Sequence, residues 1–331
     1  MAKYLVTGAA GFIGSKVIEM LLADGHVVVG VDNMNQAYDL RLKQWRLATL
    51  ISRPNFIYYC LDITDQQRLR DMFESHVDSA SESFAAVINL AARAGVRPSV
   101  INPWTYFDTN TTGTLNLLEL CKDFAVPKFI LSSTSSLYGK DNPMPWREMQ
   151  CTNLPLSPYA ASKKAAEVLC YTYHYLYGLD VTVFRYFTVY GPAGRPDMSL
   201  FRFIQWISEG RPVVVFGDGK QSRDFTYVDD IARGTIAGLA PVGYEIINLG
   251  SDEPVVLLDA IHLIEEIVGR KAVLEFETRH AADTPASWAD NNKARNLLHW
   301  QPRSVFAHGV EESVNWYMAH RAWAQEIVTY D

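Results

Sequence analysis

Short runs of β-branched and aromatic residues alternate with longer segments of helical periodicity over the first 190 residues. Strands are predicted at 3–7, 26–32, 56–62, 85–92, 128–134 and 180–187, and helices at 12–25, 39–50, 65–76, 103–125 and 159–178. Strands that alternate with helices are expected to be parallel and to be covered by helices on both faces. The preference for right-handed connections then favours a doubly wound α/β sheet.

The pattern changes after about residue 190. The segment "YGPAGRPDMS" is rich in turn-forming residues, and shorter elements follow it. We predict a helix near 199–209, a strand at 212–217, a helix after "TYVDD", a strand at 244–250 and a helix at 257–268. We therefore expect a larger part at 1–190 and a smaller substrate-binding region at 191–331, with some strands of the second part returning to the main sheet.

Composition and charge exclude several classes of function. The chain has 331 residues, of which 48% are hydrophobic, so it can bury a large core. Its net charge of −7 argues against nucleic acid as the main partner. No apolar run approaches the roughly 18 residues of a membrane span, and the first residues do not resemble a signal peptide. The four cysteines are far apart, which favours reduced thiols in the cytoplasm over disulfides or a metal site.

The stretch "VTGAAGFIG" places Gly8, Gly11 and Gly14 between the first strand and the first helix. Glycines at such a turn let the backbone approach a pyrophosphate, as in Rossmann-fold dinucleotide sites. Asp32 ends the second strand, where a carboxylate accepts a hydrogen bond from a ribose 2′-hydroxyl and repels a 2′-phosphate. The pattern therefore predicts NAD rather than NADP, with a turn-forming role as the alternative for Asp32. Asp62, after the third strand, either contacts adenine or caps a helix.

Tyr159 and Lys163 are four residues apart in "SPYAASKKAAE" and so share one face of a helix. An ammonium beside a phenol stabilises the phenolate and lowers the pKa of the phenol from roughly 10. A tyrosine tuned in this way can accept a proton from a sugar hydroxyl. Thr134, at the end of the fifth strand, is the natural third member of such a group. The alternative is that the pair is an ordinary part of the helix surface.

Motifs along nearly the whole chain carry a family resemblance. In order, they read "TGAAGFIG", "INLAARAGV", "TNTTGTLNLLE", "SSTSSLYG", "SPYAASKKAAE", "RYFTVYGPAGRPDM", "FGDGKQSRDFTYVDDI" and "NLGSDEPV". This series resembles the extended short-chain dehydrogenase/reductase superfamily and, within it, the NAD-dependent nucleotide-sugar epimerases and dehydratases. Besides the residues above, the resemblance implies further NAD-binding residues, namely Phe12, Ile13, Asn33, Ile63, Leu90, Ala91 and Ala92.

The residues after Thr134 distinguish branches of this family. Related dehydratases carry an Asp-Glu pair there and related uronate decarboxylases a nearby Glu, whereas this chain has Ser135 and Ser136. Thr188, in "RYFTVYGPAGRPDM", and the stretch "YDLRLKQWRL" resemble the UDP-glucuronate 4-epimerases. The resemblance implies that the carboxylate of a hexuronate is held by the guanidinium of Arg195 and by the hydroxyls of Thr134, Ser135, Ser136 and Thr188. An ion pair with Asp197 is the alternative for Arg195.

Two further residues are implied by the resemblance to bind UDP. Arg223, in "SRDF", is expected to neutralise the diphosphate, and Asp283 is expected in the nucleotide-binding loop. Relatives have a Pro-Gly-Asp group in that loop, whereas this chain reads "HAAD", with Ala281 and Ala282 in place of the proline and the glycine. His280 is expected to lie on the surface.

The resemblance implies NAD-dependent epimerisation at C4 of a UDP-hexuronate, from UDP-glucuronate to UDP-galacturonate, through a transient 4-keto sugar. The alternatives are a 4-epimerase of another UDP-hexose or UDP-N-acetylhexosamine, a uronate decarboxylase or dehydratase, and a non-catalytic NAD sensor. A homodimer is expected, because helices at 103–125 and 159–177 match those that pair between subunits in relatives.

Overall fold

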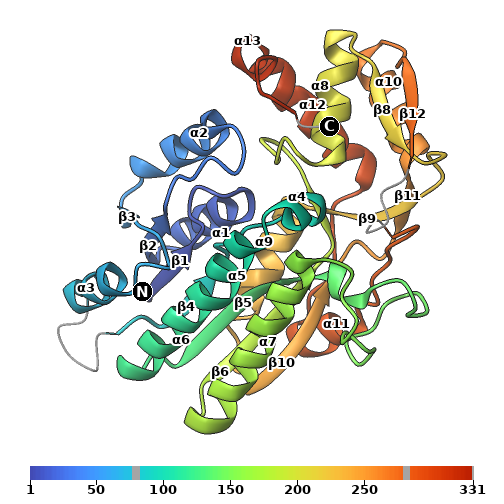
Figure 1. Ribbon diagram of the computed structural model, residues 1–331. Helices are drawn as coiled ribbons and strands as arrows, with labels where there is room; N and C mark the ends of the chain where they lie inside the picture. Colours follow the sequence, from blue (N-terminus) through green and yellow to red (C-terminus); the bar gives the residue numbers. More distant parts are fainter. Residues whose placement is uncertain (77–82, 279–283, 330–331) are drawn as a thin grey trace.

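A seven-stranded parallel sheet forms the centre of the computed structural model, which describes residues 1–76, 83–278 and 284–329 (Figure 1). Its order is β10-β6-β5-β4-β1-β2-β3. The strands are β1 (Lys3–Thr7), β2 (Val27–Asp32), β3 (Phe56–Cys60), β4 (Ala86–Asn89), β5 (Lys128–Thr134), β6 (Asp180–Tyr186) and β10 (Tyr244–Leu249). The predicted doubly wound α/β fold is confirmed. The strand order reverses between β1 and β4, which is where such sheets open a ligand crevice.

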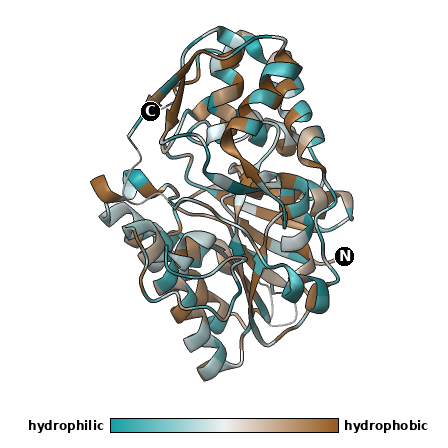
Figure 2. Cartoon of the chain, turned by 90° about the vertical axis from the view of Figure 1, so that its right-hand side faces the viewer, coloured by the Kyte–Doolittle hydropathy of each residue, from teal (hydrophilic) through white to brown (hydrophobic). Residues whose placement is uncertain are grey.

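Helices cover both faces of the sheet, as the alternating pattern requires. They are α1 (Phe12–Ala23), α2 (Leu40–Ile51), α3 (Gln66–His76), α4 (Val96–Ile101), α5 (Trp104–Phe107), α6 (Gly113–Asp123), α7 (Pro158–Tyr177), α9 (Val228–Ala237) and α11 (Asn292–Leu298). On one face, a row of Leu5, Val87 and Phe129 packs with residues of α6 and α7. On the other face, the residues that directly follow these three in their strands pack with residues of α1 and α9. Figure 2 shows the hydrophobic strands between these layers.

The prediction of a single long helix at 103–125 is wrong in detail. The segment contains α5, a π-helical turn at Asp108–Thr112 (η1) and α6. The π turn directs Asn110 inward, where its amide exchanges hydrogen bonds of 2.9 and 3.0 Å with the backbone of Arg93 and donates to Ser162 Oγ at 2.9 Å. Irregular turns of this kind occur often at functional sites. Here the turn ties the loop after β4 to α7.

Most of the chain after residue 190 lies beyond the carboxyl ends of the sheet strands, whereas β10 joins the main sheet and α9 and α11 pack on it (Figure 1). It contains α8 (Ser199–Glu209), α10 (Leu257–Val268), α12 (Phe306–Ala319) and α13 (Arg321–Ala324) around a second core. Two small sheets have the orders β11-β9-β7 and β12-β8. Their strands are β7 (Thr188–Tyr190), β8 (Val213–Phe216), β9 (Ser222–Tyr227), β11 (Pro254–Val256) and β12 (Leu274–Glu277). Within the described ranges, no helix combines the length and the apolar character that crossing a membrane requires.

Candidate active site

The loop between β1 and α1 has room for nothing larger than glycine at three positions. Gly8 has a φ of +71°, and the N–H of Gly11 donates to its carbonyl oxygen at 2.9 Å. A Cβ added at Gly14 would lie 2.1 Å from that same oxygen, closer than any real contact allows. The loop therefore leads the backbone directly into the N-terminus of α1, where free N–H groups face the crevice. This geometry fits the pyrophosphate of a dinucleotide.

Gly14→Ala should abolish dinucleotide binding and destabilise the fold by about 3 kcal/mol, because the new methyl group must displace the Gly8 carbonyl. The measurements are thermal unfolding and the NAD content of the purified protein. Gly25→Ala is the matched control, since a Cβ there meets nothing within 4 Å. That variant should lose only about 1 kcal/mol, from its left-handed backbone, and keep its NAD. Equal NAD contents in the two variants would contradict the assignment of the loop.

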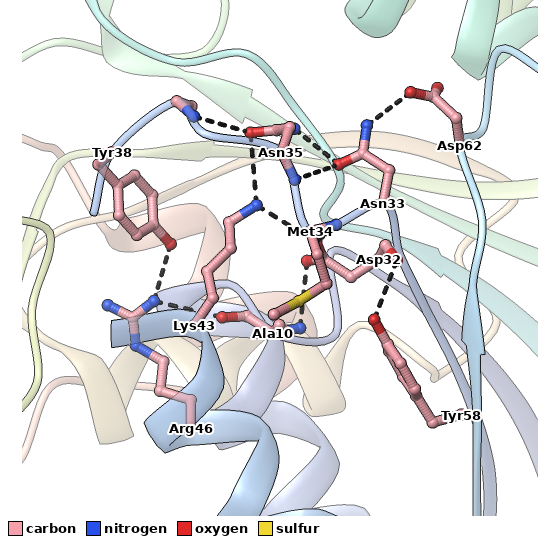
Figure 3. A network of polar contacts seen from close by, with 11 residues as sticks. Ala10, Asp32, Asn33, Met34, Asn35, Tyr38, Lys43, Arg46, Tyr58 and Asp62 are labelled. Carbon is pink, nitrogen blue, oxygen red and sulfur yellow. Dashed lines mark hydrogen bonds and ion pairs between the residues drawn. The ribbon is translucent and has the colours of Figure 1, made fainter. Parts of the chain in front are cut away.

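Asp32 lies at the end of β2 at the centre of a polar network (Figure 3). Its carboxylate accepts hydrogen bonds from Ala10 N at 3.2 Å and Met34 N at 2.8 Å, and Lys43 Nζ lies 3.2 Å away. The contact with Met34 is the turn-forming role, and the contact with Ala10 joins the carboxylate to the glycine loop. Lys43 is buried and lines the cavity, although the sequence reasoning did not single it out. It lies one turn into α2, within the stretch "YDLRLKQWRL", whose family resemblance gave no role to individual residues.

Asp62 and Asn33 meet across the ends of β3 and β2. The Asn33 amide donates to Asp62 Oδ2 at 2.5 Å, and Asp62 Oδ1 accepts from the N–H of Thr64 at 2.9 Å. Burial acts to raise the pKa of Asp62, but these hydrogen bonds hold the pKa below its ordinary value. The helix-cap alternative for Asp62 is wrong, because Asp65 accepts the hydrogen bonds at the start of α3.

One cavity of about 350 Å³ runs from this network to the end of β5. It brings together almost all residues that the sequence analysis selected. Those that line it are Gly8, Gly11, Phe12, Ile13, Gly14, Asp32, Asn33, Asp62, Ile63, Leu90, Ala91, Ala92, Thr134, Ser135, Ser136, Tyr159, Lys163, Thr188 and Arg195. The predicted cofactor loop, the tyrosine–lysine pair and the predicted carboxylate ligands thus share one space.

Tyr159 and Lys163 lie in the first turns of α7. This helix begins with Pro158, and the Ser157 hydroxyl caps it by accepting a hydrogen bond from Ala160 N at 3.2 Å. Lys163 Nζ donates to the Ser132 carbonyl at 2.8 Å, and burial lowers the pKa of this lysine to about 8. The ammonium is thereby held at the floor of the cavity.

The expected lowering of the Tyr159 pKa is not what the structure shows. Burial raises the pKa of this phenol, while the Thr134 hydroxyl and the charge of Arg195 oppose the increase. Lys163 is not among the groups that act on the pKa of Tyr159, and its ammonium donates to the Ser132 carbonyl. The two groups that lower the pKa of Tyr159, the Thr134 hydroxyl and the Arg195 guanidinium, are therefore both predicted substrate ligands.

The residues after β5 form a short 3₁₀ turn, η2 (Ser135–Tyr138), that presents hydroxyls to the cavity. Thr134 caps it, because its Oγ1 accepts from Ser136 N at 3.1 Å and donates to Ser136 Oγ at 3.1 Å. Arg195 Nε donates to Asp197 Oδ1 at 3.0 Å, with a second contact between the same two side chains. The ion pair expected as an alternative for Arg195 is thus present, and the arginine also lines the cavity.

One predicted substrate residue, Arg223, is not among the described residues that line the cavity. Arg223 lies in β9, where its Nη1 donates to the Ser222 carbonyl at 2.8 Å. Asp283 lies outside the described residues, as do His280, Ala281 and Ala282. Arg97 lies on α4. Its guanidinium lies 3.8 Å from the ring centroid of Phe216 and so joins α4 to β8.

Known proteins resemble this chain over almost its full length. The model of the NAD-dependent epimerase/dehydratase family matches residues 4–250. The chain is 57% identical to a UDP-glucuronate 4-epimerase of Thermodesulfobacterium geofontis over 317 residues, 96% of either protein.

Solved structures are also similar to this chain over almost its full length. A Bacillus cereus UDP-glucuronic acid 4-epimerase, solved with UDP-glucuronic acid and NAD, superposes with a TM-score of 0.88 at 36% identity. The match covers 96% of this chain and 99% of that one. A Thermotoga maritima UDP-glucose 4-epimerase, solved with UDP-glucose, gives 0.87 at 30% identity, with 96% and 99% covered. This chain belongs to the NAD-dependent epimerase/dehydratase family.

Proposed function

We propose that the protein is an NAD-dependent UDP-glucuronate 4-epimerase, which interconverts UDP-glucuronate and UDP-galacturonate. One observation carries this proposal: a single cavity is lined by the dinucleotide loop, Tyr159, the serines of η2 and Arg195. The 57% identity to a UDP-glucuronate 4-epimerase supports the same substrate.

The residues that would hold NAD follow from the geometry of the loop. Gly8, Gly11 and Gly14 leave the backbone free to face the pyrophosphate, and Asp32 and Lys43 stand where the ribose hydroxyls need partners. When bound, NAD supplies a reversible hydride acceptor and a positive charge. The remaining chemistry belongs to side chains of this protein.

Tyr159 is the proton carrier in this proposal. As a phenolate it accepts the proton of the sugar 4-hydroxyl while C4 is oxidised, and it returns the proton when the opposite face of the 4-keto sugar is reduced. Thr134 stabilises the phenolate with its hydroxyl, and the charge of Arg195 acts in the same direction. Lys163 is anchored on the Ser132 carbonyl, from where it would donate to the ribose of a bound cofactor.

The carboxylate ligands have a second task, because a 4-keto hexuronate is a β-keto acid and loses carbon dioxide easily. Thr134, Ser135, Ser136 and Thr188 offer hydroxyl donors, and Arg195 offers a charged one. Together they hold the carboxylate out of the orientation that loss of carbon dioxide needs. They also keep the sugar bound while it rotates within the site. Neither Ser135 nor Ser136 has the acidity that dehydration requires, so epimerisation remains.

A product assay tests the proposed function. The purified protein is incubated, without added NAD, with UDP-glucuronate, UDP-galacturonate, UDP-glucose and UDP-N-acetylglucosamine, and the products are separated by chromatography. Interconversion of the two uronates alone supports the proposal. A UDP-pentose product would make the protein a decarboxylase, epimerised neutral sugars would widen the substrate class, and bound NAD without any turnover would indicate a sensor.

Two assignments at the nucleotide end of the substrate belong to the same proposal. Arg223 is assigned to the UDP diphosphate and Asp283 to the nucleotide-binding loop, both on the resemblance of their motifs to those of relatives. The four well-separated cysteines support a reducing compartment, the cytoplasm, as the place of action.

A homodimer is the second part of the proposal, and exposed apolar side chains support it. Val168 and Tyr171 on α7 are 53% and 52% exposed, and Trp104 on α5 is 78% exposed. Helices α5, α6 and α7 lie side by side on one face of the sheet (Figure 1). A second copy of this chain would cover these side chains through the same helices.

Val168→Glu should convert the dimer to a monomer, because two buried charges would face each other across a twofold interface. Sedimentation velocity of the wild type and the variant measures the result. Ile51→Glu is the matched control: Ile51 is 61% exposed but lies on α2, away from the proposed interface. A monomeric wild type, or a dimer that survives Val168→Glu unchanged, would refute this arrangement.

A further inference from the structure

Arg46 is a buried cation beside the glycine loop and the loop that carries Arg195. It lies on α2, and its exposed fraction is 2%. Its guanidinium carbon lies 5.6 Å from the ring centroids of both Phe12 and Tyr38. All five hydrogen bonds that hold it within the described part of the chain go to neutral oxygen atoms. A buried guanidinium is costly unless its donors are satisfied, so these oxygen atoms fix its place.

The five hydrogen bonds join two segments that are far apart in the sequence. Nε and Nη2 both donate to the Ala193 carbonyl, at 3.1 and 2.6 Å, and Nη2 also donates to the Gly194 carbonyl at 3.2 Å. Nη1 donates to the Ala10 carbonyl at 3.2 Å and to the Tyr38 hydroxyl at 2.7 Å. Figure 3 shows Arg46 beside Tyr38 and Ala10. Arg46 therefore bridges the glycine loop and the loop that carries Arg195.

The loop that Arg46 holds is strained. Ala193 has a φ of +53°, in the left-handed region that favours glycine. Such a conformation persists only when surrounding contacts determine it, and two of the five hydrogen bonds of Arg46 end on the carbonyl of this residue. Arg195 follows two residues later and lines the cavity, and its side chain pairs with that of Asp197.

We propose that Arg46 is a positioning residue for substrate recognition. It holds Ala193 and Gly194 in the conformation that turns Arg195 toward the sugar, and it ties this loop to the cofactor loop through Ala10. The inference rests on the proposed function, because Arg195 is assigned there to the substrate carboxylate. It predicts that Arg46 sets the affinity for the carboxylate-bearing sugar without touching the substrate.

The test compares two ligands by calorimetry in a Tyr159→Phe background, which prevents turnover. UDP-glucuronate carries the carboxylate and UDP lacks it. Arg46→Met, which keeps length and packing, should weaken UDP-glucuronate binding about tenfold or more and change UDP binding less than twofold. The affinity of Arg46→Lys for UDP-glucuronate should lie between those of the parent and of Arg46→Met, because one ammonium cannot reach all four oxygen atoms. A loss of structure around the whole site would instead weaken both ligands equally.

Two further variants separate positioning from general stability. Ala193→Gly removes the cost of the left-handed backbone, so adding it to Arg46→Met should restore affinity for UDP-glucuronate about fivefold. Arg41→Met is the matched control, since Arg41 also lies on α2 and joins it to the C-terminal part through Glu326. This control should leave the affinities for both ligands unchanged.

The outcomes are distinct. Equal weakening of UDP and UDP-glucuronate by Arg46→Met, or no restoration by Ala193→Gly, would overturn the positioning role. If the Tyr159→Phe parent binds UDP-glucuronate no better than UDP, the proposed function fails and the role given to Arg46 fails with it.

Discussion

Tyr159→Phe should lower turnover of UDP-glucuronate about 10³-fold or more while leaving the fold and the bound NAD unchanged. The variant removes only the hydroxyl that carries the proton. The ring, which packs edge-on against Tyr106 with centroids 6.1 Å apart, remains in place. The measurements are the rate of product formation, the NAD content of the purified protein and its melting temperature.

Tyr177→Phe is the matched control for this experiment. It makes the same chemical change on the same helix, at its far end, where the tyrosine is exposed. It should keep full activity. A Tyr159→Phe variant that retains even a tenth of the wild-type rate would mean that another group moves the proton.

Arg195→Met should lower kcat/KM for UDP-glucuronate about 100-fold, which corresponds to about 2.7 kcal/mol. The reason is the loss of a charge-assisted donor to the carboxylate in a partly buried site. Part of the loss has another origin, because Asp197 would lose its partner and its charge would repel the substrate. Adding Asp197→Asn removes this repulsion, so the double variant isolates the attraction itself.

Binding of UDP-glucose provides the specificity control for Arg195. This sugar nucleotide has no carboxylate, so its dissociation constant should be the same for the wild type and Arg195→Met. An equal loss of affinity for both sugar nucleotides would remove Arg195 from the role of carboxylate ligand. It would then leave the ion pair with Asp197 as the main task of this residue.

The fold was predictable because its signals are local. Apolar strand runs and helix periodicity placed the sheet and its major helices, and the glycine loop with Asp32 indicated NAD, which the family model supports. The break in the 103–125 helix was not predictable, because Asn110 is drawn inward by partners on distant elements. The three-residue strands β7 and β11 carry too little periodicity to be recognised, whereas β8 was predicted at 212–217.

The site was predictable as a set of residues but not as a set of contacts. Tyr159 and Lys163 were selected by their spacing, yet spacing does not show that the ammonium is directed at the Ser132 carbonyl. Lys43 and Arg46 were missed for a related reason. Both look like ordinary cations of an amphipathic helix, and only the tertiary structure buries them against Asp32 and Ala193.

The position of β10 constrains how the protein can be divided. This strand lies more than fifty residues beyond β6 in the sequence, yet it forms the sheet edge beside it, in register from Tyr244 with Val181 to Leu249 with Tyr186. A fragment that ended near residue 190 would expose β6 as an unpaired, largely apolar edge, a template for association with other chains. The chain must therefore be made at least as far as Leu249 before the open edge of its cofactor half is covered.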